Sequence, residues 1–306
     1  MAKTMINQAV EGINEEVIEW RRYFHRHPEL SYQEENTSQY IYNTLLSFEN
    51  IEVSHPTKTS VMGRLIGNQT GKTVAIRADI DALPIEEENT FDFVSQNEGV
   101  MHACGHDGHT AMLLGTAKVL SGLKDEINGE VRFLFEHAEE YFPGGAKEMV
   151  EAGVLEDVDH VLAAHLMSTI DVGKIGVTYG PMTAAADAFW ISVNGTGGHG
   201  AMPHDTVDSI VVASHVVSNL QQIVSRNVDP LDSVVLTVGN FVAEEAGNVI
   251  ADRVKISGIV RSYDPKYRTS IPKRMEQIVK GSVRHMVRRI RLSTSMVFLP
   301  FTMMNT

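Results

Sequence analysis

The sequence of 306 residues contains a single cysteine and no apolar run long enough to cross a membrane. One cysteine excludes an internal disulfide, which favours a reducing cytoplasm over a disulfide-stabilised secreted scaffold. A membrane helix needs roughly 20 consecutive apolar residues, and the first residues lack the cationic and apolar segments of a signal peptide. We therefore expect a cytoplasmic protein that does not interact with membranes.

Basic residues are also scarce, since 26 lysines and arginines oppose 39 aspartates and glutamates and leave a net charge of −13. Phosphate binding requires basic patches, so this composition argues against a nucleic-acid partner. The exception is the stretch 277–306, which has no acidic residue and carries several lysines and arginines. This stretch therefore differs in character from the rest of the chain.

Metal-binding side chains are concentrated at residues 101–114, MHACGHDGHTAMLL. Cys104 lies two residues before His106, and a thiolate and an imidazole are both good donors for first-row metals. Intervening glycines relax the backbone, and the apolar spacing over 110–120 predicts a helix directly behind this loop. The alternative interpretation is a buried core cysteine beside surface histidines.

Further donors follow predicted strands in the first 180 residues, namely Asp79, Asp81, Glu139, Glu140 and His165. Carboxylates at positions i and i+2 suit a metal or the orientation of a histidine. Adjacent glutamates can supply one metal ligand and one general base. Open α/β sheets build their sites at the carboxyl ends of strands, where these residues lie. Ordinary acidic loops are the alternative interpretation.

Periodicity and turn residues predict two domains that meet near residue 180. In the first, we expect helices at 13–24 and 36–48, a hairpin of strands 61–66 and 73–78, and strands at 129–135 and 158–165. Alternating strands and helices predict an α/β domain with a largely parallel sheet. In the second, we expect a strand at 188–193, a helix at 207–224, strands at 233–242 and 253–260, a helix at 265–279 and a strand near 290–298. That order indicates a small ferredoxin-type sandwich.

Seven separated motifs, taken in order, resemble the metal-dependent amidohydrolases that include N-acyl-amino-acid amidohydrolases, hippurate hydrolases and auxin-conjugate hydrolases. The motifs are HRHPELSYQE (25–34), RADIDALPIEE (77–87), MHACGHDGHTAMLLG (101–115), AEE with GGA (138–146), His165, GTGGHGAMPH (195–204), and the surroundings of Asn248 and Arg261. Ordered agreement over about residues 13–280 is far more specific than any single motif.

The resemblance implies an α/β catalytic domain with a mostly parallel, metallopeptidase-like sheet (1–181), an inserted ferredoxin-like lid that forms a homodimer (182–298), and two divalent metal ions per site. The metals would be zinc or manganese, or else cobalt or nickel. The implied roles are metal ligation by Cys104, His106, Glu140 and His165, general base catalysis by Glu139, substrate binding by His199, Asn248 and Arg261, and orientation of the ligands by Asp79 and Asp81. Cys104 would bridge the two metals.

The implied reaction is hydrolysis of the amide bond in N-acyl amino acids or related small amides that carry a free carboxylate. Two alternatives are a metallo-carboxypeptidase or dipeptidase acting on small peptides, and an inactive truncated relative that only binds metal.

Two departures from the family pattern bear on this choice. Glu136 and His137 stand where the family usually has Gln-Pro, and His137 either alters the surroundings of the general base or points away from it. Family members also continue past the lid into a segment that supplies a last histidine ligand, whereas this sequence stops at Thr306 after an atypical tail at 281–306. We therefore expect a truncated chain with little activity; a natural, divergent C-terminus is the alternative.

Overall fold

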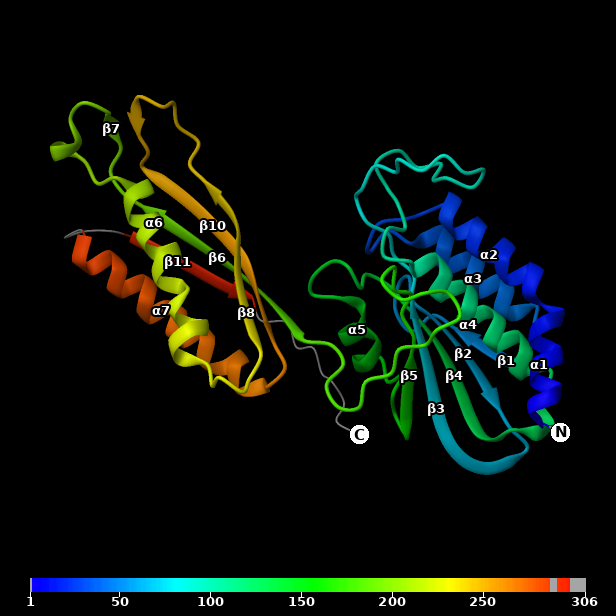
Figure 1. The fold of residues 1–306 in the computed structure, drawn as a ribbon. Coiled ribbons are helices and arrows are strands. Elements are labelled where there is room, and N and C mark those ends of the chain that lie inside the picture. The colour runs from blue at the N-terminus through cyan, green and yellow to red at the C-terminus, as the bar shows by residue number, and fades with distance from the viewer. Residues whose placement is uncertain (1, 287–290, 298–306) are drawn as a thin grey trace. The chain divides into compact units, whose positions relative to one another are not determined.

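The computed structural model describes residues 2–286 and 291–297, and the chain divides into two compact units, residues 1–174 and 175–306 (Figure 1). The first unit contains, in chain order, α1 (Ala2–Gly12), α2 (Asn14–Arg26), α3 (Glu35–Leu46), β1 (Ile51–Ser54), β2 (Val61–Ile66), β3 (Gln69–Asp79), α4 (His106–Ser121), η1 (Lys124–Glu126), β4 (Asn128–Glu136), α5 (Gly145–Glu151) and β5 (His160–Ala163). None of the helices in the described residues is long and apolar enough to span a membrane.

The sheet of the first unit has the strand order β1-β2-β4-β3-β5. The pairs β1–β2 and β2–β4 are antiparallel, whereas β4–β3 and β3–β5 are parallel. The prediction of a largely parallel sheet is therefore wrong, and the sheet is mixed. The predicted hairpin is also wrong, because β4 lies between β2 and β3.

Glycines explain why the turn after β2 does not close a hairpin. The connection from β2 to β3 passes over the start of β4, where Gly67 donates its backbone N–H to the carbonyl of Gly129 over 2.9 Å. A Cβ atom at Gly67, Gly71 or Gly129 would run into the backbone of the other segment. The turn residues were correctly identified, but they allow a close backbone crossing rather than a two-strand turn.

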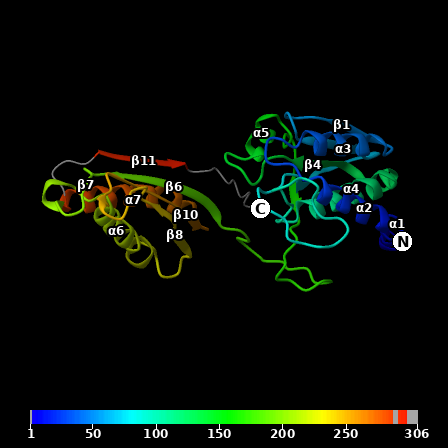
Figure 2. The same ribbon diagram turned by 90° about the horizontal axis from the view of Figure 1, so that it is seen from above.

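The central strand β4 is buried on both faces of the sheet because its successive side chains point in opposite directions. Phe133 and Phe135 belong to the core formed with α2, α3 and α4, whereas Leu134 packs with Met149 of α5 on the other face. Figure 2 shows α2, α3 and α4 gathered together and α5 set apart from them. Helices therefore cover both faces of the sheet.

The second unit contains β6 (Ala185–Asn194), β7 (Gly198–His199), η2 (Pro203–Asp205), α6 (Ser209–Leu220), a π-helical turn η3 (Ile223–Asn227), β8 (Val234–Val242), β9 (Val249–Ile250), β10 (Arg253–Ser262), α7 (Pro265–Met286) and β11 (Arg291–Val297). Its main sheet has the order β11-β6-β10-β8 and is antiparallel throughout. The strand predicted near 290–298 is β11. The atypical tail predicted for 281–306 falls partly on 287–290 and 298–306, outside the described residues.

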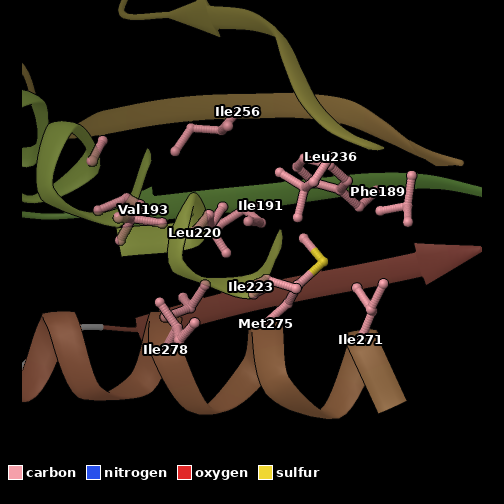
Figure 3. Packing of buried hydrophobic residues seen from close by; sticks show 14 of the residues in the cluster. Phe189, Ile191, Val193, Leu220, Ile223, Leu236, Ile256, Ile271, Met275 and Ile278 are labelled. Atoms are coloured by element: carbon pink, nitrogen blue, oxygen red, sulfur yellow. The ribbon is translucent and has the colours of Figure 1, made fainter. Parts of the chain in front are cut away.

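One hydrophobic core holds the second unit together. Ile191 and Val193 of β6 and Ile256 of β10 face Leu220 of α6 and Met275 of α7 (Figure 3). Asp208 caps α6, because its side chain accepts the N–H groups of Ile210 and Val211. The alternating apolar pattern of the strands and the amphipathic helices predicted this packing.

Candidate active site

Three neighbouring strands deliver donor side chains to one edge of the first sheet. Strands β4, β3 and β5 run parallel to one another, so their carboxyl ends lie together. Asp79 ends β3 and Asp81 follows it, Glu139 and Glu140 lie beyond the end of β4, and His165 lies beyond the end of β5. The order of the strands thus explains why residues far apart in the sequence converge.

The start of α4 completes this group. The helix begins at His106 rather than near residue 110, and Gly105 precedes it with a φ of 88°, a left-handed conformation that suits glycine. The Sγ atom of Cys104 lies 3.5 Å from Nε2 of His165. One ligand atom from each of Cys104, His106 and His165 lies within 4.8 Å of the others. The same holds for His106, Glu139 and Glu140.

His106 is common to both groups and is 1% exposed. Its Nδ1 atom lies 2.9 Å from the carbonyl oxygen of Asp81, which makes it the donor and leaves Nε2 with a free lone pair. Nε2 lies 3.7 Å from Oε1 of Glu140, and both buried atoms lack a hydrogen-bond partner among the described residues. Buried polar atoms of native proteins are normally satisfied, so this arrangement fits a bound cation.

The charge balance of the site also favours a cation. Burial lowers the pKa of His106, but Asp81, Cys104 and Asp79 outweigh this effect and raise the pKa above its ordinary value. Burial raises the pKa of Glu139, opposed by Arg77 and His106 and assisted by neighbouring carboxylates. The raised pKa of His106 reflects the negative groups around it, and neighbouring carboxylates also add to the effect of burial on the pKa of Glu139. A divalent metal would neutralise this excess of negative charge.

Asp81 links three parts of the site. Its Oδ1 lies 3.3 Å from Nδ1 of His106, while Oδ2 accepts the hydroxyl of Ser31 over 2.6 Å and the backbone N–H of Glu140 over 2.9 Å. Because Asp81 contacts both His106 and the glutamate loop, its geometry fits the orienting role that the family resemblance implies.

Asp79 acts together with two residues to which the sequence had assigned no role. Arg77 donates to Oδ2 of Asp79 over 2.7 Å, and Nδ1 of His109 lies 2.6 Å from Oδ1. Nε2 of His109 accepts the backbone N–H of Leu166 over 2.8 Å, next to His165. Arg77 lies in the motif RADIDALPIEE and His109 in the motif MHACGHDGHTAMLLG. Membership of these motifs is the only feature of the sequence that pointed to a role for the two residues.

The unusual Glu136-His137 pair does not enter the donor cluster. Glu136 accepts a hydrogen bond from Nε of Arg77 over 2.7 Å. Nε2 of His137 lies 3.2 Å from the carboxylate of Glu148, and its Nδ1 lies 3.4 Å from the hydroxyl of Thr57. Of the two possibilities left open, His137 therefore points away from the candidate base.

The predicted substrate-binding residues all lie in the second unit. His199 of β7 pairs with Val249 of β9, and the carbonyl of Asn248 accepts the N–H of Gly200 over 3.0 Å, so His199 and Asn248 share one two-stranded ribbon. Arg261 lies near the carboxyl end of β10, whereas β9 leads into the amino end of that strand. The unit thus brings the first two residues together and keeps Arg261 apart.

Comparison with known proteins extends these observations. The sequence pattern of peptidase family M20/M25/M40 matches residues 75–303. The chain belongs to this family. An N-acyl-L-amino acid amidohydrolase from Geobacillus stearothermophilus is 61% identical over 281 residues, which cover 92% of this chain and 76% of that protein. The family resemblance inferred from the seven motifs is confirmed, and with it the prediction of a hydrolase.

Two solved structures of this peptidase family or its near relatives have the same fold. A putative aminohydrolase from methicillin resistant Staphylococcus aureus has a TM-score of 0.90 and 39% identity, with 98% of this chain and 79% of that chain covered. A dinuclear metal binding peptidase of the M20 family from Bacillus subtilis has a TM-score of 0.77 and 35% identity, with coverages of 95% and 75%.

Proposed function

We propose that the protein hydrolyses the amide bond of N-acyl amino acids, with two divalent cations held by Cys104, His106, Glu140 and His165. The observation that carries this proposal is the unpaired face of His106 and Glu140 beside the Cys104–His165 contact. The likeness to an N-acyl-L-amino acid amidohydrolase supports the substrate class. Thiolate and imidazole donors favour zinc, and the mixed carboxylate set also suits manganese, cobalt or nickel.

Glu139 is the general base in this proposal. When bound, the cations supply Lewis acidity that activates water and polarises the substrate carbonyl. The side chain of Glu139 is 30% exposed, whereas that of His106 is 1% exposed, so Glu139 is open to both water and substrate. Glu139 takes a proton from the attacking water as the new C–O bond forms, and returns it to the amine nitrogen as the C–N bond breaks.

We further propose that residues 1–181 form the catalytic domain and that 182–298 form a ferredoxin-like lid through which the protein dimerises. The β-α-β-β-α-β order and the strand order β11-β6-β10-β8 support the ferredoxin-like assignment. His199, Asn248 and Arg261 are surface residues of that unit. Their imidazole, amide and guanidinium groups suit the substrate carboxylate and the developing oxyanion.

The test is turnover of N-acetyl and N-benzoyl amino acids by protein loaded with zinc or manganese. Turnover would contradict the low activity expected for a truncated chain, and its absence would support the inactive metal-binding alternative. We expect Glu139→Gln to lower kcat by at least about 100-fold without changing the metal content measured by elemental analysis. Glu148→Gln, which changes a carboxylate outside the cluster, is the matched control and should retain activity. Cleavage of dipeptides but not of N-acyl amino acids would instead support the peptidase alternative, and full activity of Glu139→Gln would remove Glu139 from its role.

A further inference from the structure

The segment that carries Glu139 and Glu140 begins with a strained residue. Ala138 has a φ of 49°, in the left-handed region that residues other than glycine rarely adopt. Such a conformation costs on the order of 1 kcal/mol and persists only where the surroundings enforce it. The direction in which Glu139 leaves the backbone depends directly on this residue.

A buried carboxylate binds the backbone N–H of this residue. Glu34 is fully buried, and its Oε1 atom accepts the backbone N–H of Ala138 over 2.7 Å. The same oxygen accepts the N–H of Tyr32 over 2.9 Å, and Tyr32 is also left-handed, with a φ of 65°. The other oxygen, Oε2, accepts the hydroxyl of Thr59 over 3.0 Å.

Glu34 forms no ion pair within 4.0 Å in the described part of the chain. Burying a carboxylate without a cation is costly unless strong hydrogen bonds satisfy it. Here the compensation comes from two backbone amides and one hydroxyl, and one of those amides precedes the candidate general base. Glu34 is the last residue of the motif HRHPELSYQE, and it is neither a candidate metal ligand nor a candidate substrate-binding residue.

We propose that Glu34 is a positioning residue that fixes Glu139 through the backbone of Ala138. The segment is then held on both sides of Glu139, because Asp81 accepts the N–H of Glu140 over 2.9 Å. This inference rests on the proposed role of Glu139. Glu34 acts as a hydrogen-bond acceptor, and its negative charge is not required.

Two substitutions separate the acceptor from the charge. Glu34→Gln keeps an oxygen at the Oε1 position for both amides, and the Thr59 hydroxyl can rotate to accept from the new amide. Glu34→Leu removes every acceptor and fills a similar volume. We expect Glu34→Gln to keep kcat within about 2-fold, and Glu34→Leu to lose roughly 10- to 100-fold in kcat with KM nearly unchanged, because catalysis is sensitive to displacements of about 1 Å.

Thr59→Val is the matched control for stability. It removes only the contact to Oε2 and leaves the Ala138 amide bound, so it should lower the unfolding midpoint without lowering kcat. Ala138→Gly, introduced into Glu34→Leu, should restore part of the lost kcat, since glycine adopts a positive φ without strain. A residue that only stabilised the fold would not produce this rescue.

Hydrogen exchange of the Ala138 amide provides a readout that is independent of activity. We expect faster exchange in Glu34→Leu than in the wild type and in Glu34→Gln. Equal exchange in all three proteins would overturn the proposal, as would full kcat in Glu34→Leu or equal loss of kcat in both variants. If Glu34→Leu does not fold, a large loss of kcat in Glu34→Gln still overturns it and retention of kcat supports it. An inactive wild-type protein would refute the proposed function, while the exchange data would still decide whether Glu34 holds Ala138.

Discussion

Replacing Glu130 by glutamine measures how much one ion-pair cluster contributes to the stability of the first unit. Arg64 of β2 and Arg132 of β4 lie directly opposite each other, which places two positive charges side by side. Glu130 lies between them, and its Oε1 accepts from Nε of Arg64 over 2.7 Å and from Nε of Arg132 over 2.8 Å. Like charges across strands are destabilising, so the carboxylate offsets a repulsion that the sheet itself creates.

The size of the effect follows from the pKa of Glu130. The hydrogen bond from Arg64 lowers this pKa most, burial opposes the change, and Arg132 lowers the pKa further, to about 2. A change from the ordinary value of 4.5 to about 2 corresponds to about 3 kcal/mol at neutral pH. Solvent screening at this partly exposed cluster reduces our expectation to roughly 2 kcal/mol. Because the folded-state pKa is the lower one, the stabilisation is present above pH 4.5 and is lost as the pH falls toward about 2.

The assay uses the fact that the two tryptophans, Trp20 and Trp190, lie in different units. In a Trp190→Phe background, Trp20 fluorescence reports urea unfolding of the first unit alone. We expect Glu130→Gln to lower its free energy of unfolding by about 2 kcal/mol at pH 7, with the difference shrinking between pH 4.5 and pH 3. Glu35→Gln, which breaks the surface pair with Lys58, is the control and should leave the midpoint unchanged. A difference that stays constant from pH 7 to pH 3 would refute the ionisation argument.

Three further substitutions test other contacts. His109→Asn removes the acceptor for the Leu166 amide and should weaken zinc binding roughly 10-fold in a chelator competition. The longer side chain of His109→Gln can still reach that amide and should bind zinc more tightly than His109→Asn. Equal zinc affinities of the two variants would contradict this account. Gly145→Ala places a Cβ against the carbonyl oxygen of residue 137 and should cost about 1–3 kcal/mol in urea unfolding of the first unit; an unchanged midpoint would show that the loop can relax. Asp187→Ala breaks a part-buried bidentate pair with Arg268 and should destabilise the second unit by about 2 kcal/mol, because the remaining Arg268 side chain is partly open to water. Trp190 fluorescence reports this change, and an equal loss of stability in the first unit would contradict the independence of the two cores.

The sequence was most informative where local chemistry decides the outcome. Asp81, Glu139 and His165 were expected at one edge because each follows a strand, and parallel strands end together. The neighbour of a strand in a sheet depends on residues far away in the sequence. The glycine-rich turn after β2 could therefore be located from the sequence, whereas the pairing of β2 with β3 was predicted wrongly. For the same reason, His109 and Glu34 were recognised only as parts of motifs, since the contact of His109 with Asp79 spans 30 residues and that of Glu34 with Ala138 spans 104 residues.

The separation of the donors along the chain links metal binding to folding. Cys104, Glu140 and His165 belong to segments that meet only when β3, β4 and β5 have paired, so the unfolded chain has no comparable set of ligands. A cation that binds only the folded form stabilises it by mass action, by about 2.7 kcal/mol at a free concentration 100 times its Kd. The unfolding midpoint of the first unit therefore becomes a direct measure of metal affinity, and chelation should lower it even in a variant that has lost turnover.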